Sequence, residues 1–233
     1  MSWADGELIA LDLEATSANP LEALPVSFAL LHLDDGIVIR RRYGLIRPGV
    51  PIPPESTEIH GITDDMVEER GGALAASIAG LAAALCEGPP VVACNAAYDI
   101  TVIDTCFRRL FPGLRAPAEE VRLIDPLVID RHCDKYRKGS RKLTALCATY
   151  GVPYSNAHHA GADAEAAARV AFAIAEKYPE VGEADIDLLH ALEMGWHREF
   201  IDHLSDYYVS QGKEPLASEE RDWPVRGLKG VSL

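Results

Sequence analysis

Apolar and polar residues alternate near the start of the chain, in the stretch LIALDLEATS. Ile9, Leu11 and Leu13 take the odd positions, and Asp12 and Glu14 lie between and after them. Successive side chains of a β-strand point to opposite faces, so the two acids share one face and the three apolar side chains share the other. The pattern predicts a largely buried strand that carries two neighbouring carboxylates.

Further strand patterns follow. The runs PVSFALLHLD and GIVIRRRYGLI are joined at Asp35-Gly36, a dipeptide typical of hairpin turns. A Pro-rich loop, RPGVPIPP, ends this part of the chain. The short apolar runs PPVVAC and VRLID predict two more strands, which brings the expected sheet to five strands.

Helical spacing dominates the rest of the chain. An Ala-rich amphipathic helix is expected over residues 72–87, and YDITVIDTCFRRLF and AGADAEAAARVAFAIAEKY have apolar residues at helical intervals. Strands followed by alternating helices and strands predict an α/β fold, a mixed five-stranded sheet flanked by helices. We expect one domain over residues 1–180 and a helical C-terminal extension with an irregular tail over residues 181–233.

The composition is that of an ordinary globular protein, with 48% hydrophobic and 25% charged residues among 233. No apolar run is long enough for a membrane span, and the N-terminus lacks the basic region of a signal peptide. The five cysteines form no CxxC pair, which favours reduced thiols over disulfides or a zinc site. We therefore expect a cytoplasmic protein without a membrane partner.

The net charge of −14 argues against broad nucleic-acid binding, which normally needs a basic surface. Positive charge is nevertheless clustered at residues 40–42 and in KYRKGSRK, residues 135–142. The second cluster has two interpretations at this stage. It is either a solvated loop or a patch that contacts phosphates beside an acidic site.

Two adjacent carboxylates on a buried strand need a stabilising partner, because burial and mutual repulsion both disfavour their charged forms. Hard oxygen ligands favour Mg²⁺ or Mn²⁺ as that partner. The alternative is an exposed strand face near a sheet edge. The D-x-E spacing alone is weak evidence, since it recurs at Asp163 and Glu165.

Two other segments carry acids at the start of a predicted helix. Asp99 follows the strand VVAC, and Asp163 lies five residues after His158. An acid in the first turn of a helix is explained by favourable interaction with the helix dipole alone. The same position also suits a ligand that points across the end of a sheet.

Four blocks of the sequence resemble the motifs of the DEDDh, or DnaQ-like, 3′–5′ exonucleases, the family that includes the proofreading epsilon subunit and RNase T. The family motifs read D-x-E-T-T-G, H-N-A-x-F-D, H-x-A-x-x-D-A and H-G-I-T. The corresponding blocks here are Asp12-Leu-Glu14-Ala-Thr16-Ser, Cys94-Asn95-Ala-Ala-Tyr98-Asp99, His158-His-Ala160-Gly-Ala-Asp163-Ala164 and His60-Gly61-Ile62-Thr63. They occur in the family's order and cover about residues 7–176.

The sequence departs from these motifs at Ala15, Ser17 and Cys94, none of which replaces a catalytic acid or the histidine. The resemblance implies an RNase H-like fold. It also implies two divalent cations, Mg²⁺ or Mn²⁺, and a set of residues that hold them. By this resemblance the metal ligands are Asp12, Glu14, Asp99 and Asp163, with Asp12 shared by both ions.

The same resemblance makes His158 the general base, in preference to its neighbour His159. It also assigns contacts with the terminal nucleotide. The residues expected to make those contacts are Thr16, His60, Asn95 and Tyr98, although a simple packing role is a close alternative for His60 and Tyr98.

The expected function is a metal-dependent 3′–5′ exonuclease that releases nucleoside 5′-monophosphates from single-stranded or frayed ends, in DNA repair or proofreading. The alternatives are an exoribonuclease of the RNase T or oligoribonuclease type and a catalytically silent nucleic-acid-binding module. The expected partners are single-stranded DNA or RNA 3′ ends. A homodimer or a polymerase partner stays open, as does the role of residues 181–233.

Overall fold

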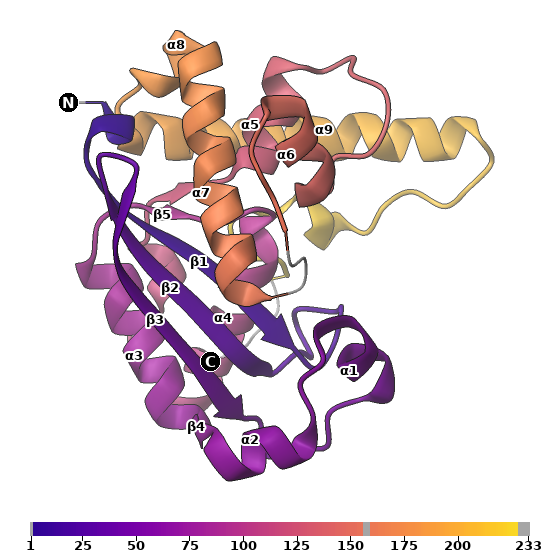
Figure 1. The fold of residues 1–233 in the computed structure, drawn as a ribbon. Helices are drawn as coiled ribbons and strands as arrows, with labels where there is room; N and C mark the ends of the chain where they lie inside the picture. Colours follow the sequence, from indigo (N-terminus) through magenta and orange to yellow (C-terminus); the bar gives the residue numbers. More distant parts are fainter. Residues whose placement is uncertain (1, 156–158, 228–233) are drawn as a thin grey trace.

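A mixed sheet of six strands, in the order β4-β3-β2-β1-β5-β6, runs through the computed structural model, which describes residues 2–155 and 159–227 (Figure 1). β1 pairs antiparallel with β2 and parallel with β5, so it lies in the interior of the sheet. The strands are β1 (Glu7–Ala15), β2 (Pro25–Asp34), β3 (Ile37–Arg47), β4 (Gly72–Ala73), β5 (Val91–Val92) and β6 (Leu123–Ile124).

The predicted mixed sheet and its hairpin are confirmed. Asp35 and Gly36 both have positive φ, 47° and 70°, as a two-residue type I′ turn requires. The sheet has one strand more than expected. β4 pairs in parallel with Ile46 and Arg47 at the end of β3, so the helix expected from residue 72 starts two residues later.

Helices flank the sheet and form the C-terminal region. They are α1 (Pro54–His60), α2 (Asp64–Arg70), α3 (Leu74–Glu87), α4 (Ala96–Leu110), α5 (Pro126–Cys133), α6 (Leu143–Tyr150), α7 (Ala160–Lys177), α8 (Pro179–Gly182) and α9 (Ile186–Ser210). Short 3₁₀ turns occupy Trp3–Asp5, Pro117–Glu119 and Ser218–Arg221. In the described chain, none of the helices combines the length and apolar character that crossing a membrane would need.

The two faces of the sheet are covered by different helices. α7 crosses one face, and α3 and α4 lie on the other (Figure 1). Leu8 and Ala10 of β1 pack in the same core cluster as the apolar residues of α7, whereas Ile9 and Leu11 belong to the cluster of α3 and α4. Continuing the alternation, the acids of β1 emerge on the α7 side near the carboxyl end of the strand.

The C-terminal region packs against the sheet and its helices. α9 contacts α5 and β6, and the indole nitrogen of Trp3 donates a hydrogen bond to the Val181 carbonyl. The segment after α9 is mostly irregular, as expected, yet Trp223 and Val225 are buried in the core cluster of α4. The Arg226 N–H also donates to the Thr101 hydroxyl. The division into residues 1–180 and 181–233 stays a prediction.

Candidate metal-binding active site

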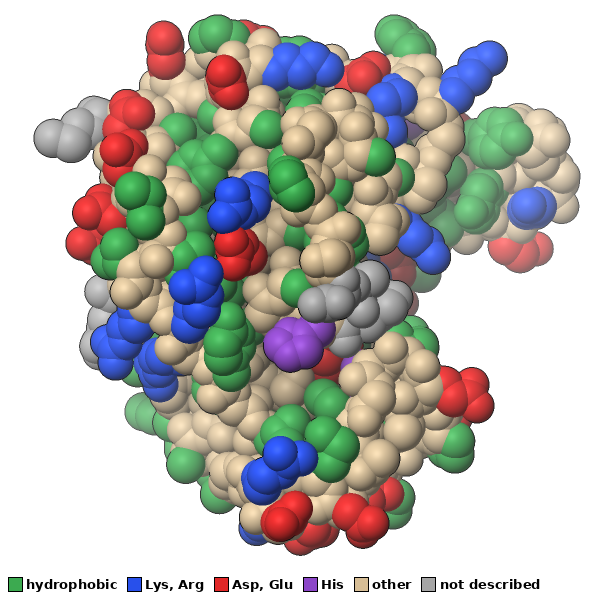
Figure 2. Space-filling view, viewed as in Figure 1, with side chains coloured by type: hydrophobic (Ala, Val, Ile, Leu, Met, Phe, Trp, Pro, Cys, Tyr) green, Lys and Arg blue, Asp and Glu red, His purple; other side chains and the backbone are tan. Residues whose placement is uncertain are grey.

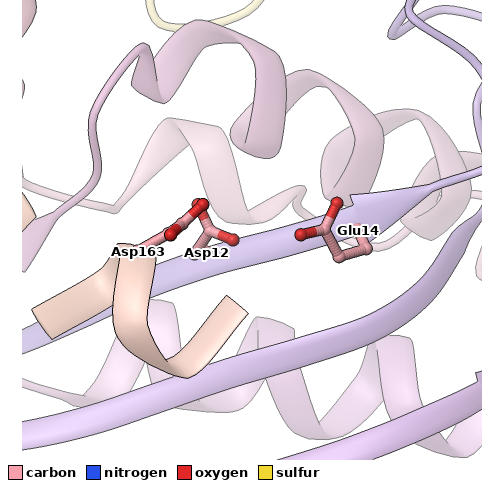
Figure 3. Close-up of side chains that lie close together, drawn as sticks. All are labelled: Asp12, Glu14 and Asp163. Atoms are coloured by element: carbon pink, nitrogen blue, oxygen red, sulfur yellow. The ribbon is translucent and has the colours of Figure 1, made fainter. Parts of the chain in front are cut away.

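Three carboxylates from distant parts of the sequence converge at the end of β1. Asp12 and Glu14 project from β1, and Asp163 projects from the first turn of α7. One oxygen from each residue lies within 4.8 Å of the others, and the three side chains point toward a common space (Figure 3). The crossing of α7 over β1 therefore brings together three of the four predicted metal ligands.

Asp99 lies beside this cluster rather than among the three converging oxygens. It is buried in the first turn of α4, and its Oδ1 accepts a hydrogen bond of 3.0 Å from the N–H of Leu13. Leu13 is the residue between the two acids of β1. The hydrogen bond therefore fixes Asp99 next to the strand that carries Asp12 and Glu14.

Burial and neighbouring acids disfavour the charged forms of Asp12, Glu14 and Asp99. Burial, followed by the charges of Asp99, Asp163 and Glu14, raises the pKa of Asp12 well above its usual range. Burial and the charge of Asp163 raise the pKa of Glu14 to about 7. Burial is also the main reason that the pKa of Asp99 rises to about 8.

In the described part of the chain, neither Asp12 nor Glu14 forms an ion pair with a lysine or arginine. A group of oxygen ligands with uncompensated negative charge fits a hard divalent cation, which would remove the repulsion among them. The donor set is therefore suited to the predicted metal.

Tyr154 is a member of the site that the sequence patterns did not indicate. Its hydroxyl donates a 2.6 Å hydrogen bond to Oδ1 of Asp163. Burial and this hydrogen bond raise the pKa of Tyr154, so the phenol keeps its proton and remains a donor. Nothing in its sequence neighbourhood marks Tyr154, because its partner Asp163 lies nine residues later, on α7.

Of the predicted nucleotide contacts, His60 lines the cavity that Glu14 also lines, and Thr16 is buried directly after β1. The Thr16 hydroxyl oxygen accepts a hydrogen bond from the Leu24 N–H, which joins the two ends of the loop between β1 and β2. His60 ends α1, and its Nδ1 accepts from the Ile62 N–H. Burial lowers the pKa of His60, so its ring is neutral near pH 7. Direct contact of either residue with a nucleotide stays a prediction.

The other two predicted contacts precede or begin α4. Asn95 is exposed and has a left-handed backbone, with φ of 66°, and Tyr98 is half-buried. The Tyr98 hydroxyl donates to the Ser17 carbonyl, and burial together with the charge of Asp99 raises its pKa. Tyr98 thus packs between α4 and the loop that follows β1, and its ring remains a candidate for stacking on a base.

His158, the predicted general base, lies outside the described residues, so its role stays a prediction. Its neighbour His159 precedes α7, and the imidazole ring meets the Tyr43 ring edge-on, with 6.4 Å between their centroids. Gly161 lets the Tyr43 ring lie directly against the backbone at the start of α7. A Cβ added there would lie 2.5 Å from a ring carbon of Tyr43.

A cavity of about 490 Å³ opens beside the carboxylates. Glu14, His60 and His159 contribute to its wall, together with apolar side chains that include Phe28 and Met66. Figure 2 shows this face of the molecule hollowed between its upper part and the lower lobe that carries α1 and α2. The size is typical of a small-molecule or nucleotide site.

The basic loop at residues 135–142 is neither simply solvated nor wholly available to phosphates. Arg137 and Arg141 both form ion pairs with Asp130, which is fully buried in α5. Lys138 and Lys142 are exposed. Two of its basic residues, Arg137 and Arg141, therefore have a structural role, and the two lysines lie on the surface.

This loop also borders a second cavity, of about 720 Å³, between the end of α5 and α9. Besides Lys135 and the two arginines, its wall includes the rings of Tyr136, Trp196, Phe200 and Tyr207. Lys135 is paired with Glu199 across the groove. Cationic and aromatic side chains therefore line a groove distinct from the carboxylate site.

The chain is similar to DNA-processing exonucleases in sequence. A family described as exonuclease, the RNase T family, matches residues 9–171. DNA polymerase III PolC-type of Lacticaseibacillus paracasei is 30% identical over 73% of this chain but only 11% of its own length. DNA polymerase III subunit epsilon of Haemophilus influenzae is 29% identical over 70% of this chain and 64% of its own length.

Solved structures agree on the fold. Exonuclease I of E. coli, in complex with a dT13 oligonucleotide, matches with a TM-score of 0.66 and 23% identity, over 75% of this chain and 42% of that one. Exonuclease I of Methylocaldum szegediense matches with a TM-score of 0.63 and 25% identity, over 75% and 41% of the two chains. The expected RNase H-like fold is confirmed, and the chain belongs to the RNase T family of exonucleases, within the DnaQ-like 3′–5′ exonuclease group.

Proposed function

We propose that this protein is a metal-dependent 3′–5′ exonuclease that removes nucleoside 5′-monophosphates from single-stranded or frayed ends. The observation that carries the proposal is the convergence of Asp12, Glu14 and Asp163, together with the raised pKa of Asp12 and of Glu14. Asp12, Glu14 and Asp163 would hold one Mg²⁺ or Mn²⁺ ion, and Asp12 and Asp99 the other. Such ions activate a water molecule and neutralise the departing 3′ oxygen.

The chain's own residues supply proton transfer and orientation. His158 takes the proton of the attacking water, since a neutral imidazole is an effective base near pH 7. His60 and Tyr98 border the space where the terminal nucleotide would lie, and Thr16 holds the loop between them.

Replacing each of the two adjacent histidines in turn tests which one is the general base. His158→Ala should lower kcat about 10²- to 10⁴-fold, the usual contribution of a positioned general base. His159→Ala should cost much less, because its ring packs against Tyr43. Single-turnover kinetics on a short oligonucleotide would measure both, and a larger loss in His159→Ala would transfer the role to that residue.

The proposed substrate is DNA. The relatives named above are DNA polymerase III proteins, and one matching exonuclease I structure contains a dT13 oligonucleotide. RNA ends are the alternative, and the same chemistry would serve either. A role in repair or proofreading follows from DNA as substrate and belongs to the same proposal.

The test is product analysis on labelled DNA and RNA oligonucleotides of one sequence, with Mg²⁺, Mn²⁺, Ca²⁺ or EDTA. We expect a ladder that shortens from the 3′ end, mononucleotide products, support from Mg²⁺ or Mn²⁺, and faster loss of DNA. Asp12→Asn is the inactive control. Cleavage of a circular single strand would contradict the exonuclease assignment, and binding without hydrolysis would favour the silent module.

A further inference from the structure

A buried carboxylate outside the acidic cluster holds the start of α4. Asp125 follows β6 and is 1% exposed. Its Oδ1 accepts hydrogen bonds from the N–H groups of Asn95 and Leu127, at 3.0 and 2.9 Å, and its Oδ2 accepts from the Ala96 N–H at 2.9 Å. One side chain thus joins the starts of two helices, α4 and α5.

The start of α4 depends on this distant acceptor. Asn95 occupies the N-cap position but has a left-handed backbone, and its side chain makes no capping hydrogen bond. The first N–H groups of a helix need acceptors from elsewhere, and here Asp125, the residue after β6, accepts from the N–H groups of Asn95 and Ala96. The turn held in this way carries Asp99, whose Oδ1 in turn accepts from the Leu13 N–H.

α9 contributes the next contact. Glu193 is fully buried, and its Oε1 accepts a 2.9 Å hydrogen bond from the Asp125 N–H. Burial and the nearby charge of Asp125 raise the pKa of Glu193, so a neutral side chain of the same shape is a fair substitute for it. A continuous series of hydrogen bonds and one helical turn therefore runs from α9 through Asp125 and Asp99 to the strand of the acidic cluster.

We propose that Asp125 and Glu193 are positioning residues that set the distance between Asp99 and the carboxylates of β1, which makes α9 part of the support of the active site. The proposal rests on the proposed function, in which Asp99 helps to hold one of two cations. Replacing a residue that orients a metal ligand through hydrogen bonds typically lowers metal affinity or activity about 10- to 100-fold.

Asp125→Asn is the first variant. It keeps the size of the side chain but exchanges one acceptor oxygen for an N–H₂ group, so at least one backbone N–H of the three loses its partner. We expect kcat to fall about 10- to 100-fold with little change in KM, and Mn²⁺ affinity, measured by calorimetry without substrate, to fall by a similar factor at one site.

Asp104→Asn is the matched control. Asp104 is also a buried carboxylate associated with α4, but it lies farther along the helix, where it pairs with Arg108 and accepts from the Ala118 N–H. Its replacement should lower the melting temperature and leave kcat and Mn²⁺ affinity unchanged. Equal losses in Asp104→Asn and Asp125→Asn would overturn the proposal, as would unchanged Mn²⁺ affinity in Asp125→Asn.

Glu193 gives a second, independent pair of variants, which decides the matter if Asp125→Asn does not fold. Glu193→Gln keeps the acceptor oxygen and should behave like the wild type, whereas Glu193→Leu should lose Mn²⁺ affinity and kcat together. Indistinguishable variants would overturn the role of α9. Because Mn²⁺ binding is measured without substrate, wild-type protein that binds Mn²⁺ but hydrolyses nothing would refute the proposed function and leave this comparison standing.

Discussion

The protein treats buried carboxylates in two opposite ways. Around Asp130 every charge has a partner. Arg137 and Arg141 both contact its Oδ2, and the Tyr150 hydroxyl donates to its Oδ1 at 2.9 Å. Around Asp12 the neighbouring charges are other acids, and they raise its pKa.

The comparison separates a structural carboxylate from a functional one. A buried acid that the chain itself neutralises needs nothing from solution. Half-buried acids whose nearest charges are other acids are stabilised by protonation or by a bound cation. The two regions also differ in burial, since Asp130 is fully buried and Asp12 and Glu14 are half-buried. The deeper carboxylate is the one that the chain neutralises with its own arginines.

The largest expected difference between the two regions is in catalysis. Asp12→Asn should lower kcat about 10³-fold or more, because a bound cation supplies several kcal/mol of charge stabilisation in the transition state. Asp130→Asn should leave kcat of the folded protein unchanged and lower the free energy of unfolding by about 3–5 kcal/mol, since two arginines lose their partner. Denaturant titrations and single-turnover rates would measure both. A stability loss in Asp12→Asn without metal would contradict the comparison.

The second expected difference is in pH dependence. The pKa of Glu14 rises from 4.5 to about 7 on folding. At pH values between these two, the folded state therefore binds more protons than the unfolded state. The free energy of unfolding of the metal-free protein should therefore fall as pH rises through this window, and further as Asp99 ionises near its pKa of about 8. Melting temperatures with and without Mn²⁺ would show it.

Two further results are expected from the melting temperatures measured against pH. Mn²⁺ should raise the melting temperature more at pH 8 than at pH 5, because protons compete with the metal for the same oxygens. Asp12→Asn should flatten the metal-free profile, since one source of repulsion is gone. If the melting temperature of the metal-free protein were the same at pH 5 and pH 8, the raised pKa values of Glu14 and Asp99 would be contradicted.

A matched pair of tyrosines gives a smaller effect. Tyr154 donates to Asp163 in the acidic cluster, and Tyr150 donates to Asp130 in the compensated site. Tyr154→Phe should weaken Mn²⁺ binding about 10-fold with little loss of stability. Tyr150→Phe should lower the free energy of unfolding by about 1–3 kcal/mol and leave Mn²⁺ affinity unchanged. Calorimetry would measure Mn²⁺ affinity and denaturant titration the free energy of unfolding in both variants. Weaker Mn²⁺ binding in Tyr150→Phe than in Tyr154→Phe would contradict the prediction.

The smallest expected effect concerns the basic loop. Lys138→Ala with Lys142→Ala should raise KM on long strands and flatten its salt dependence by about 0.7 in log–log slope for each phosphate that the loop no longer binds. Arg137→Ala with Arg141→Ala should act on stability instead, because both side chains neutralise Asp130. An unchanged salt slope in the lysine variant would make these two residues plain surface charges.

Local patterns predicted much of the fold and the centre of the site. The alternation in β1 placed Asp12 and Glu14 on one face, and the structure has them there. The hairpin turn and the long helices α4 and α7 also follow their patterns closely. These features depend on residues near one another in the sequence, where period and turn chemistry are informative.

Some missed features had local signals, and others depend on contacts between distant segments. α1 and α2 had no predicted helix, although Pro54 at the first position of α1 and the capping Thr63 before α2 are local signals. Burial of Trp223 and the contact between Glu193 and Asp125 could not be read from spacing. Asp125 had a usable signal, since it ends a strand beside the one that leads to Asn95.

The distance along the chain between β1 and α7 has a consequence for biosynthesis. Asp12 leaves the ribosome long before Asp163, which follows after all six strands of the sheet have been made. Since domains fold as units during synthesis, a nascent chain that ends before α7 carries two of the converging acids without the third. Burial of Trp223 in the α4 cluster delays completion of the core further. The complete acidic cluster, and any chemistry that depends on it, therefore forms only after α7 has been translated.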